Sequence, residues 1–494
     1  MPSLDLAVKH YDINLAYQPH SGVLTGSTRI RGVAVRTLST FRLRFRLRVS
    51  SVHVNGKPAA FTSDNGTLTI TPKTPAGVGD ELLVAVHYRD TPAAYPAGDG
   101  GWGWIRTPTG ALAVVSAAWW HPAALTPAAR ATRSVSVLVP RGLTAVSNGT
   151  LRRGSPTVTS DGDRWSWYSK TPLPTETALL AIGDYSLTKS RGPDGTPVFN
   201  AYGKDLGALE APARASVERT AEAAQTLSRW FGPYPYEAVG GVVDKAFNNV
   251  VATATRPIYG GSYFADGANP SMVAHETAHH WYGNAVAPAE DAAWLSEGFA
   301  TYAEFLWSEH SGLGTAAELA QQEYDQYPQD DPVWKEAPAI PNPDGFLSFP
   351  VYTRGALTLQ ALRTKVGDDT FFRILRGWVT AQKPDTEATT AAFTAYAERL
   401  HSRPLDDVFR PWLYGTTRPP VGPNGQRPRK PAAEPTSTPP SPATGTVSLL
   451  RTTAIGARAR DRQRLHRRNV GRTSWPCRGR RCGRAPTGGR GRSG

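Results

Sequence analysis

Residues 275–300 read HETAHHWYGNAVAPAEDAAWLSEGFA and contain the most informative pattern in the chain. His275 and His279 are four residues apart, so on a helix with ~3.6 residues per turn their side chains share one face. Two neutral imidazoles placed in this way can bind one metal ion, and ~2.0–2.1 Å is the usual distance from zinc to such a nitrogen. The spacing therefore predicts a metal site on this face.

The helix that would carry the motif has clear end signals. Asn269 is a suitable N-cap, Pro270 a suitable first residue and Gly283 a suitable end, which predicts a helix over residues 270–283. Glu276 follows the first histidine and is expected to lean toward the open position of the metal. A carboxylate there can take a proton from an attacking water molecule, so Glu276 is the expected general base.

A catalytic zinc site needs a third protein ligand as well as an open position. Glu297 is the candidate, because Ser296 is a typical N-cap and would place Glu297 in the first turn of the next helix. Glu304 follows on the same helix face, where it is either a hydrogen-bond acceptor for a ligand histidine or a surface glutamate. His280 lies off the face of the metal pair and is expected to pack or to form hydrogen bonds.

Composition divides the chain into three segments. Residues 1–190 contain short runs of alternating apolar and polar residues, such as 28–35 and 41–49, with Asn-Gly and Asp-Gly turn signals between runs. This pattern predicts a β-rich N-terminal domain, a sandwich or a saddle. Residues 191–417 are expected to form the catalytic domain, with helices predicted over residues 209–230, 270–283, 296–310, 315–327, 351–366, 368–381 and 389–400.

Residues 418–494 form the third segment, rich in Pro, Ser and Thr at first and in Arg and Gly later. Such a composition buries too little apolar surface to fold, so a disordered tail is expected. The segment holds 18 Lys and Arg against 2 Asp and Glu, whereas residues 1–417 hold 37 against 39. The net charge of +14 therefore gives no reason to expect nucleic acid binding by residues 1–417. The tail is either a basic arm for nucleic acid or anionic surfaces, or a reading frame that continues past the native end.

The distribution of apolar residues indicates where in or outside the cell the protein is expected. No apolar run approaches the ~18–20 residues that span a bilayer, so no membrane span is expected. The first residues include Asp5 and lack the apolar segment of a signal peptide. The chain as written is therefore expected in the cytoplasm, or outside the cell if its start is truncated. The sequence does not indicate an oligomeric state.

The motifs resemble those of the M1 family of zinc aminopeptidases, and most closely its short bacterial type. The family combines an HExxH helix with the glutamate of an L-N-E-G-F-A segment, and here one residue fewer than usual separates His279 from Glu297. Residues 281–284 (WYGN) are similar to the family's W-F-G-D/N stretch, and residues 352–357 (YTRGAL) to its Y-x-K-G-A segment.

The resemblance implies a multidomain α+β fold: an N-terminal β saddle or sandwich, a mainly helical thermolysin-like zinc peptidase domain, and the disordered basic tail. It implies a zinc metallo-aminopeptidase that hydrolyses peptide bonds near the N-terminus of peptide substrates, with one Zn²⁺ per chain. By the same match, His275, His279 and Glu297 would bind the zinc and Glu276 would activate water. Tyr352 would stabilise the oxyanion, a role that suits an O–H aimed at developing negative charge.

The sequence also departs from the family pattern. Ala252 stands where the family has a glutamate that holds the free amine of the substrate, and Leu125 stands where it has an aspartate. Asp244 and Asp266 are the nearest acids that could replace the lost glutamate. A buried amine without a carboxylate is costly, so the alternative is a pseudo-peptidase that binds peptides through a degraded amine site.

Overall fold

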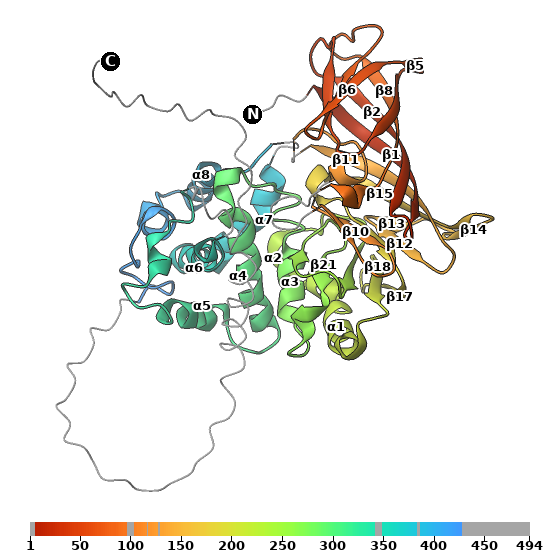
Figure 1. The fold of residues 1–494 in the computed structure, drawn as a ribbon. Coiled ribbons are helices and arrows are strands. Elements are labelled where there is room, and N and C mark those ends of the chain that lie inside the picture. The colour runs from red at the N-terminus through yellow and green to blue at the C-terminus, as the bar shows by residue number, and fades with distance from the viewer. Residues whose placement is uncertain are drawn as a thin grey trace, which may run out of the picture.

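The protein is described by a computed structural model over residues 5–95, 103–115, 117–126, 129–340, 348–382 and 386–426. Figure 1 shows a strand-rich N-terminal half, coloured red to orange, beside a mainly helical half, coloured green to blue. The expected order of a β-rich part followed by a helical part is confirmed. None of the described helices is both long and apolar enough to cross a membrane.

The largest sheet fills the N-terminal half. Its order is β13 (Thr150–Leu151), β15 (Gly162–Pro174), β11 (Arg130–Val139), β1 (Leu6–Gln18), β2 (Val23–Ala34), β8 (Glu81–Asp90), β4 (Val49–Val54) and β5 (Lys57–Pro58), with β14 (Thr157–Thr159) on β15. Neighbouring strands are antiparallel except β1 and β11. Buried residues alternate with more exposed ones along β2 and β8, so one face packs on the core.

Two smaller sheets complete this half. One contains β12 (Thr144–Ser147), β16 (Leu180–Gly183), β10 (Ala111–Val114) and β9 (Gly103–Arg106), and the other β3 (Phe41–Arg44), β7 (Thr67–Thr71) and β6 (Ala60–Asp64). Every residue of β10, β12 and β16 is buried, so that sheet is covered on both faces. All three sheets share one hydrophobic core.

A five-stranded sheet opens the second half. It contains β17 (Tyr185–Arg191), β18 (Pro197–Gly203), β19 (Val239–Asp244), β21 (Ile258–Gly260) and β20 (Val250–Val251), in that spatial order. Strands β18, β19 and β21 are parallel, and β20 is an antiparallel edge strand. The predicted boundary after residue 190 falls inside β17, because the Gly-Pro-Asp-Gly turn at 192–195 closes a hairpin and does not link two domains.

The helices are α1 (Glu210–Val217), α2 (Thr220–Phe231), α3 (Pro270–Ala278), α4 (Trp294–His310), α5 (Ala316–Asp325), α6 (Phe349–Val366), α7 (Asp368–Ala381), α8 (Thr390–His401) and α9 (Asp406–Phe409). The shorter ones are η1 (Pro92–Ala94), η2 (Ala117–Trp119), η3 (Thr175–Thr177), η4 (Gly207–Leu209), η5 (Gly261–Phe264), η6 (Glu290–Ala292), η7 (Pro332–Lys335) and η8 (Arg410–Tyr414). The predicted helices are present, although the one over 209–230 is divided into α1 and α2. The one over 270–283 ends early, at Ala278.

Helices α4 and α6 pack closely against each other. Helix α4 carries Glu297 and α6 carries Tyr352, so this contact helps to position both residues. A Cβ atom on Gly298 would lie 2.8 Å from the Cα of Gly355, a distance that side chains do not tolerate. Glycine at both positions therefore lets the two helix backbones approach each other directly.

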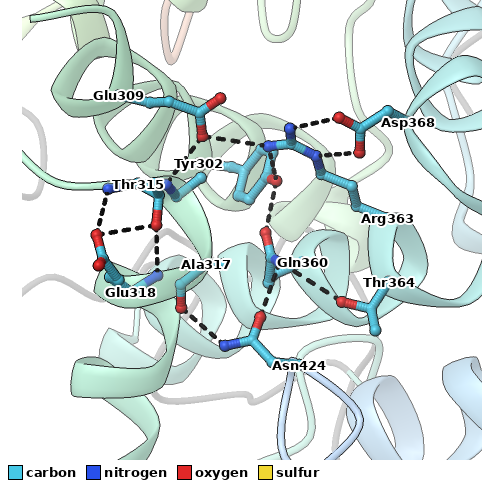
Figure 2. Close-up of polar contacts among 11 residues, drawn as sticks. Tyr302, Glu309, Thr315, Ala317, Glu318, Gln360, Arg363, Thr364, Asp368 and Asn424 are labelled. Carbon is cyan, nitrogen blue, oxygen red and sulfur yellow. Dashed lines mark hydrogen bonds and ion pairs between the residues drawn. The ribbon is translucent and has the colours of Figure 1, made fainter. Parts of the chain in front are cut away.

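Residues 418–426 pack on the helical half, so their assignment to a disordered tail is corrected. The hydroxyl of Tyr324, on α5, donates to the carbonyl of Pro419 at 2.7 Å. Figure 2 shows Asn424 between two helices: it donates to the carbonyl of Ala317 on α5 at 2.8 Å and accepts from Gln360 on α6 at 2.9 Å. Composition could not reveal these individual contacts. The rest of the predicted tail, residues 427–494, lies outside the described part of the chain.

Candidate metal centre

Helix α3 carries the histidine pair as the sequence predicts. Asn269 caps the helix by accepting a hydrogen bond from the Met272 N–H at 3.2 Å, and Pro270 is its first residue. The last helical residue is Ala278, so His279 is the C-cap. The rings of His275 and His279 still lie together, with their centroids 4.9 Å apart.

A tight turn brings the third candidate ligand to this pair. Gly283 has a φ of 129°, and a Cβ atom there would lie 2.7 Å from the Ser296 hydroxyl oxygen. Helix α4 then begins at Trp294 with Ala293 as its N-cap, so the prediction of Ser296 as N-cap is wrong. Glu297 nevertheless lies in the first turn of α4, as expected.

The three candidate ligands form one cluster. Glu297 Oε2 lies 3.5 Å from His275 Nε2 and 3.3 Å from His279 Nε2. No other such group of three ligand atoms occurs among the residues that the structure describes. Tetrahedral ligands at ~2.0–2.1 Å from zinc would be about 3.4 Å apart, so the spacing suits this metal.

The outer nitrogen, Nδ1, of each ring already has hydrogen-bond partners. His275 Nδ1 donates to Glu304 Oε1 at 2.8 Å, and Ser271 donates to the other oxygen of that carboxylate at 3.1 Å. His279 Nδ1 is 3.0 Å from the Ser296 hydroxyl and 3.1 Å from the carbonyl oxygen of residue 282. Both Nε2 atoms therefore face the Glu297 carboxylate, and each can offer its lone pair to a metal ion once its proton is released.

These contacts decide between the two expected positions of Glu304, a hydrogen-bond acceptor or a surface residue. They also add two residues that the sequence did not assign to the metal site, Ser271 and Ser296. Glu304 orients a ligand histidine, because one of its oxygens accepts the Nδ1–H of His275. Ser271 lies one helical turn before His275, and that spacing could have identified it. Ser296 could not be assigned, because its contact with His279 depends on the turn at Gly283.

The electrostatics of the cluster also favour a cation. Burial lowers the pKa of His275, but hydrogen bonds to Glu297 and Glu304 outweigh it and raise this pKa to about 10. Burial likewise opposes ionisation of Glu297, yet His279 and His275 hold the pKa of its carboxyl below the usual range. A metal ion would have to displace protons from these rings, so metal binding should weaken as the pH falls.

The two expected catalytic side chains border the cluster. Glu276 is buried, with 8% of its surface exposed, and its charge helps to raise the pKa of His279. Tyr352, on α6, stacks on His275 with ring centroids 6.2 Å apart and planes 17° apart. Burial, and then the charges of Glu297 and Glu276, raise the pKa of Tyr352 well above its usual value. Its phenol therefore remains an O–H donor at neutral pH.

His280 is buried and forms hydrogen bonds, as expected, and does not point at the candidate ligands. Its Nδ1 accepts from the Tyr234 hydroxyl at 2.8 Å, and its Nε2 donates to the Thr253 carbonyl at 3.3 Å. Burial lowers the pKa of His280 to about 3, so the ring is neutral.

The position expected to hold an amine-binding acid lies beside the metal helix. Asn284, in the turn after α3, donates to the carbonyl of Ala252 at 3.1 Å. Of the two acids that could substitute, Asp244 already accepts from the Tyr185 hydroxyl at 2.6 Å and from the backbone N–H of residue 246 at 2.8 Å. Asp266 is exposed in the segment before α3. The contacts of Asp244 therefore direct its carboxylate away from Ala252.

Comparisons with known proteins agree with this geometry. Residues 264–412 match the model of the peptidase family M1 domain. The crystal structure of an M1 zinc metallopeptidase from Deinococcus radiodurans superposes with a TM-score of 0.73 and 26% identity, over 89% of this chain and 98% of that one. A mutant of that enzyme has been solved with a Tyr-Ser-Ala substrate, at a TM-score of 0.74.

Two curated proteins are also similar. Aminopeptidase B from Rattus norvegicus is 27% identical over 345 residues, which are 63% of this chain and 50% of that protein. Aminopeptidase N from Streptomyces lividans is 27% identical over 275 residues, which are 50% of this chain and 31% of that protein. The chain thus spans half or less of the curated relatives that it matches.

Proposed function

Because the chain belongs to the M1 family of zinc metallopeptidases, we propose that it is an aminopeptidase that hydrolyses peptide bonds near the N-terminus of peptides. The observation that carries the proposal is the cluster of His275, His279 and Glu297, with every outer nitrogen of the histidines engaged. A binding site for a structural metal would close all positions with protein ligands, whereas three ligands leave one position for chemistry.

The chain's own residues have distinct roles in this reaction. Zinc held by the three ligands would supply a Lewis acid for the scissile carbonyl and lower the pKa of water. Glu276 accepts the proton of the attacking water and passes it to the leaving amine nitrogen. Tyr352 donates its phenol O–H to the carbonyl oxygen as negative charge develops there. Glu304 holds the His275 ring in the tautomer that leaves Nε2 unprotonated.

A second candidate function is peptide binding without efficient turnover. It is favoured by Ala252, which offers no carboxylate to a substrate amine, and by Asp244, whose oxygens are engaged elsewhere. A substrate ammonium desolvated without a partner binds weakly. In this case Ala252→Glu should restore turnover of free-amine peptides.

Two matched reporters test the proposal on the full chain: an aminoacyl amide with a free amine and its N-acetylated twin, each with and without a chelator. Release from the free-amine reporter alone, abolished by the chelator, is the expected result. Release from the blocked twin would contradict exopeptidase specificity. Bound zinc with no release from either reporter would favour the second candidate.

A further inference from the structure

The turn at residues 252–257, between β20 and β21, joins the two halves of the molecule beside the metal centre. Thr255 in this turn is fully buried and has a φ of 68°. A β-branched residue rarely adopts this left-handed conformation and keeps it only where surrounding contacts fix it. The contacts on each side of the turn identify what holds it.

The N-terminal half supplies the first set of contacts. Asn148 Nδ2 donates to the carbonyl of Ala254 at 2.6 Å and to the carbonyl of Thr177 at 3.0 Å. The N–H of Gly149 donates to the Thr255 hydroxyl oxygen at 3.0 Å. The N–H of Ala254 donates to the carbonyl of Thr177 at 3.2 Å. The end of β12 and the short helix η3 therefore fix the shape of a turn that belongs to the other half.

Arg256 strengthens the same junction. Its guanidinium is buried, lies 4.7 Å from the centre of the Trp167 ring and donates to the carbonyl of Ser147 at 2.8 Å. It also donates to the Thr255 hydroxyl oxygen at 3.3 Å. This single hydroxyl oxygen thus accepts hydrogen bonds from Gly149 in the N-terminal half and from Arg256 in the turn itself.

The opposite side of the turn contacts the segment that leaves the metal helix. Asn284 donates from its side chain to the carbonyl of Ala252 at 3.1 Å, and its own N–H donates to the carbonyl of His279 at 2.9 Å. His280 donates to the carbonyl of Thr253 at 3.3 Å. Since His279 is a candidate ligand, the turn links the N-terminal half to the metal centre, with hydrogen bonds to one on each side.

Strand β20 leads directly into this turn and is the edge of its sheet. An edge strand presents backbone groups with which an extended peptide can pair. We propose that the turn is a positioning element through which the N-terminal half holds this edge at the metal centre, with Thr255 as its positioning residue. The proposal rests on the proposed function, because it concerns where that site takes up its peptide.

Removing the Thr255 hydroxyl should release the turn without altering the metal cluster, which it does not contact. Peptide affinity should therefore fall while zinc binding is unchanged. Thr255→Ala should raise the Kd and the KM for a tripeptide about three- to tenfold, the range expected from one lost buried hydrogen bond. Thr255→Ser keeps the hydroxyl and should stay within about twofold of the parent protein.

The experiment uses the full chain with Glu276→Gln as background, and measures tripeptide binding by calorimetry together with zinc content. Thr28→Ala is the matched control, because it removes a buried threonine hydroxyl that lies 3.1 Å from the Tyr88 hydroxyl and does not contact the turn. Thr255→Gly is the second variant, since glycine adopts a positive φ at little cost and should fold where alanine does not.

The expected pattern is weakened binding for Thr255→Ala and Thr255→Gly, and parental binding for Thr255→Ser and Thr28→Ala. Parental affinity in Thr255→Ala or Thr255→Gly would overturn the proposal, as would equal weakening by Thr28→Ala. A failure of the proposed function looks different: the parent protein would then neither bind the tripeptide nor release a reporter in a chelator-sensitive manner.

Discussion

Glu276 is the side chain that moves the proton in the proposed reaction. Glu276→Gln keeps the size of the side chain but cannot accept a proton, so turnover should fall by a factor of ~10² or more. Zinc content should be unchanged, because Glu276 is not among the three candidate ligands. The measurement is kcat and zinc content for this variant, with the exposed Glu290→Gln as control. A kcat near that of the parent would disprove the role of general base.

The sequence predicted the residues of the site better than their surroundings. The face that His275 and His279 share follows from helix periodicity, and Glu297 was correctly expected in the first turn of the next helix although its N-cap was not. The role of Glu276 as general base stays a prediction. Tyr352 was assigned only through the resemblance, and the structure stacks it on His275. The partners of the ring nitrogens were partly missed, because they belong to separate turns of the chain.

At the scale of elements, α6 carries Tyr352 and is anchored by one buried arginine. Arg354 uses all five of its N–H groups on backbone carbonyls: those of Trp334 and Glu336 on one side, and those of Pro411, Trp412 and Gly415 on the other. Five acceptors arranged around one side chain match the donor count of a guanidinium.

Arg354→Lys should therefore destabilise the helical half. A lysine offers three donors, which leaves at least two buried carbonyls without a partner and costs about 2–4 kcal/mol of the free energy of unfolding. Urea denaturation of the full chain measures this, with Arg373→Lys as control, because Arg373 is exposed and donates to a single carbonyl. Equal stability of the two variants would show that the five contacts contribute little.

Helices and strands were predicted well where the apolar pattern extends over many residues, and were missed where that pattern is short. Helices such as α4 and α6 were expected close to their observed ends because their apolar spacing and end signals extend over several turns. Strands β19 and β21 were missed, since they are short and buried on both faces and so lack an alternating pattern. They determine where β20, the edge strand that leads into the 252–257 turn, is placed.

At the scale of the whole molecule, residues 418–426 connect helices that are distant in sequence. Figure 2 shows that Asn424 contacts Gln360, which in turn accepts from the Tyr302 hydroxyl at 2.8 Å. Tyr302 lies on α4, the helix that holds Glu297, and Gln360 lies on α6, the helix that holds Tyr352. The segment therefore connects the two helices that carry the candidate ligand Glu297 and the candidate catalytic residue Tyr352.

Asn424→Ala should lower the free energy of unfolding by about 1–2 kcal/mol, because it removes hydrogen bonds to Ala317 and Gln360 at a half-buried position. The measurement is urea denaturation of the full chain, with the exposed Gln426→Ala as control. No difference between the two variants would mean that the segment rests on the helices without stabilising them.

Global organisation was predictable in outline, since the change from strand to helix patterns is strong. Its boundaries were not, for two reasons. The turn at 192–195 signals a hairpin as readily as a linker, and the Pro-rich composition after Arg418 concealed contacts that depend on single side chains such as Asn424. The junction through Thr255 was also invisible, because it joins residues more than 100 positions apart.

Zinc affinity, measured by competition with a chromophoric chelator, tests the metal centre most directly. The full chain should bind one zinc ion, and Glu297→Gln should bind it at least tenfold more weakly, a loss of about 1.4 kcal/mol or more. Glu290→Gln, an exposed glutamate in the same connecting segment, should bind zinc as the parent does. Absence of zinc binding by the parent chain, or unchanged affinity in Glu297→Gln, would contradict the proposed centre.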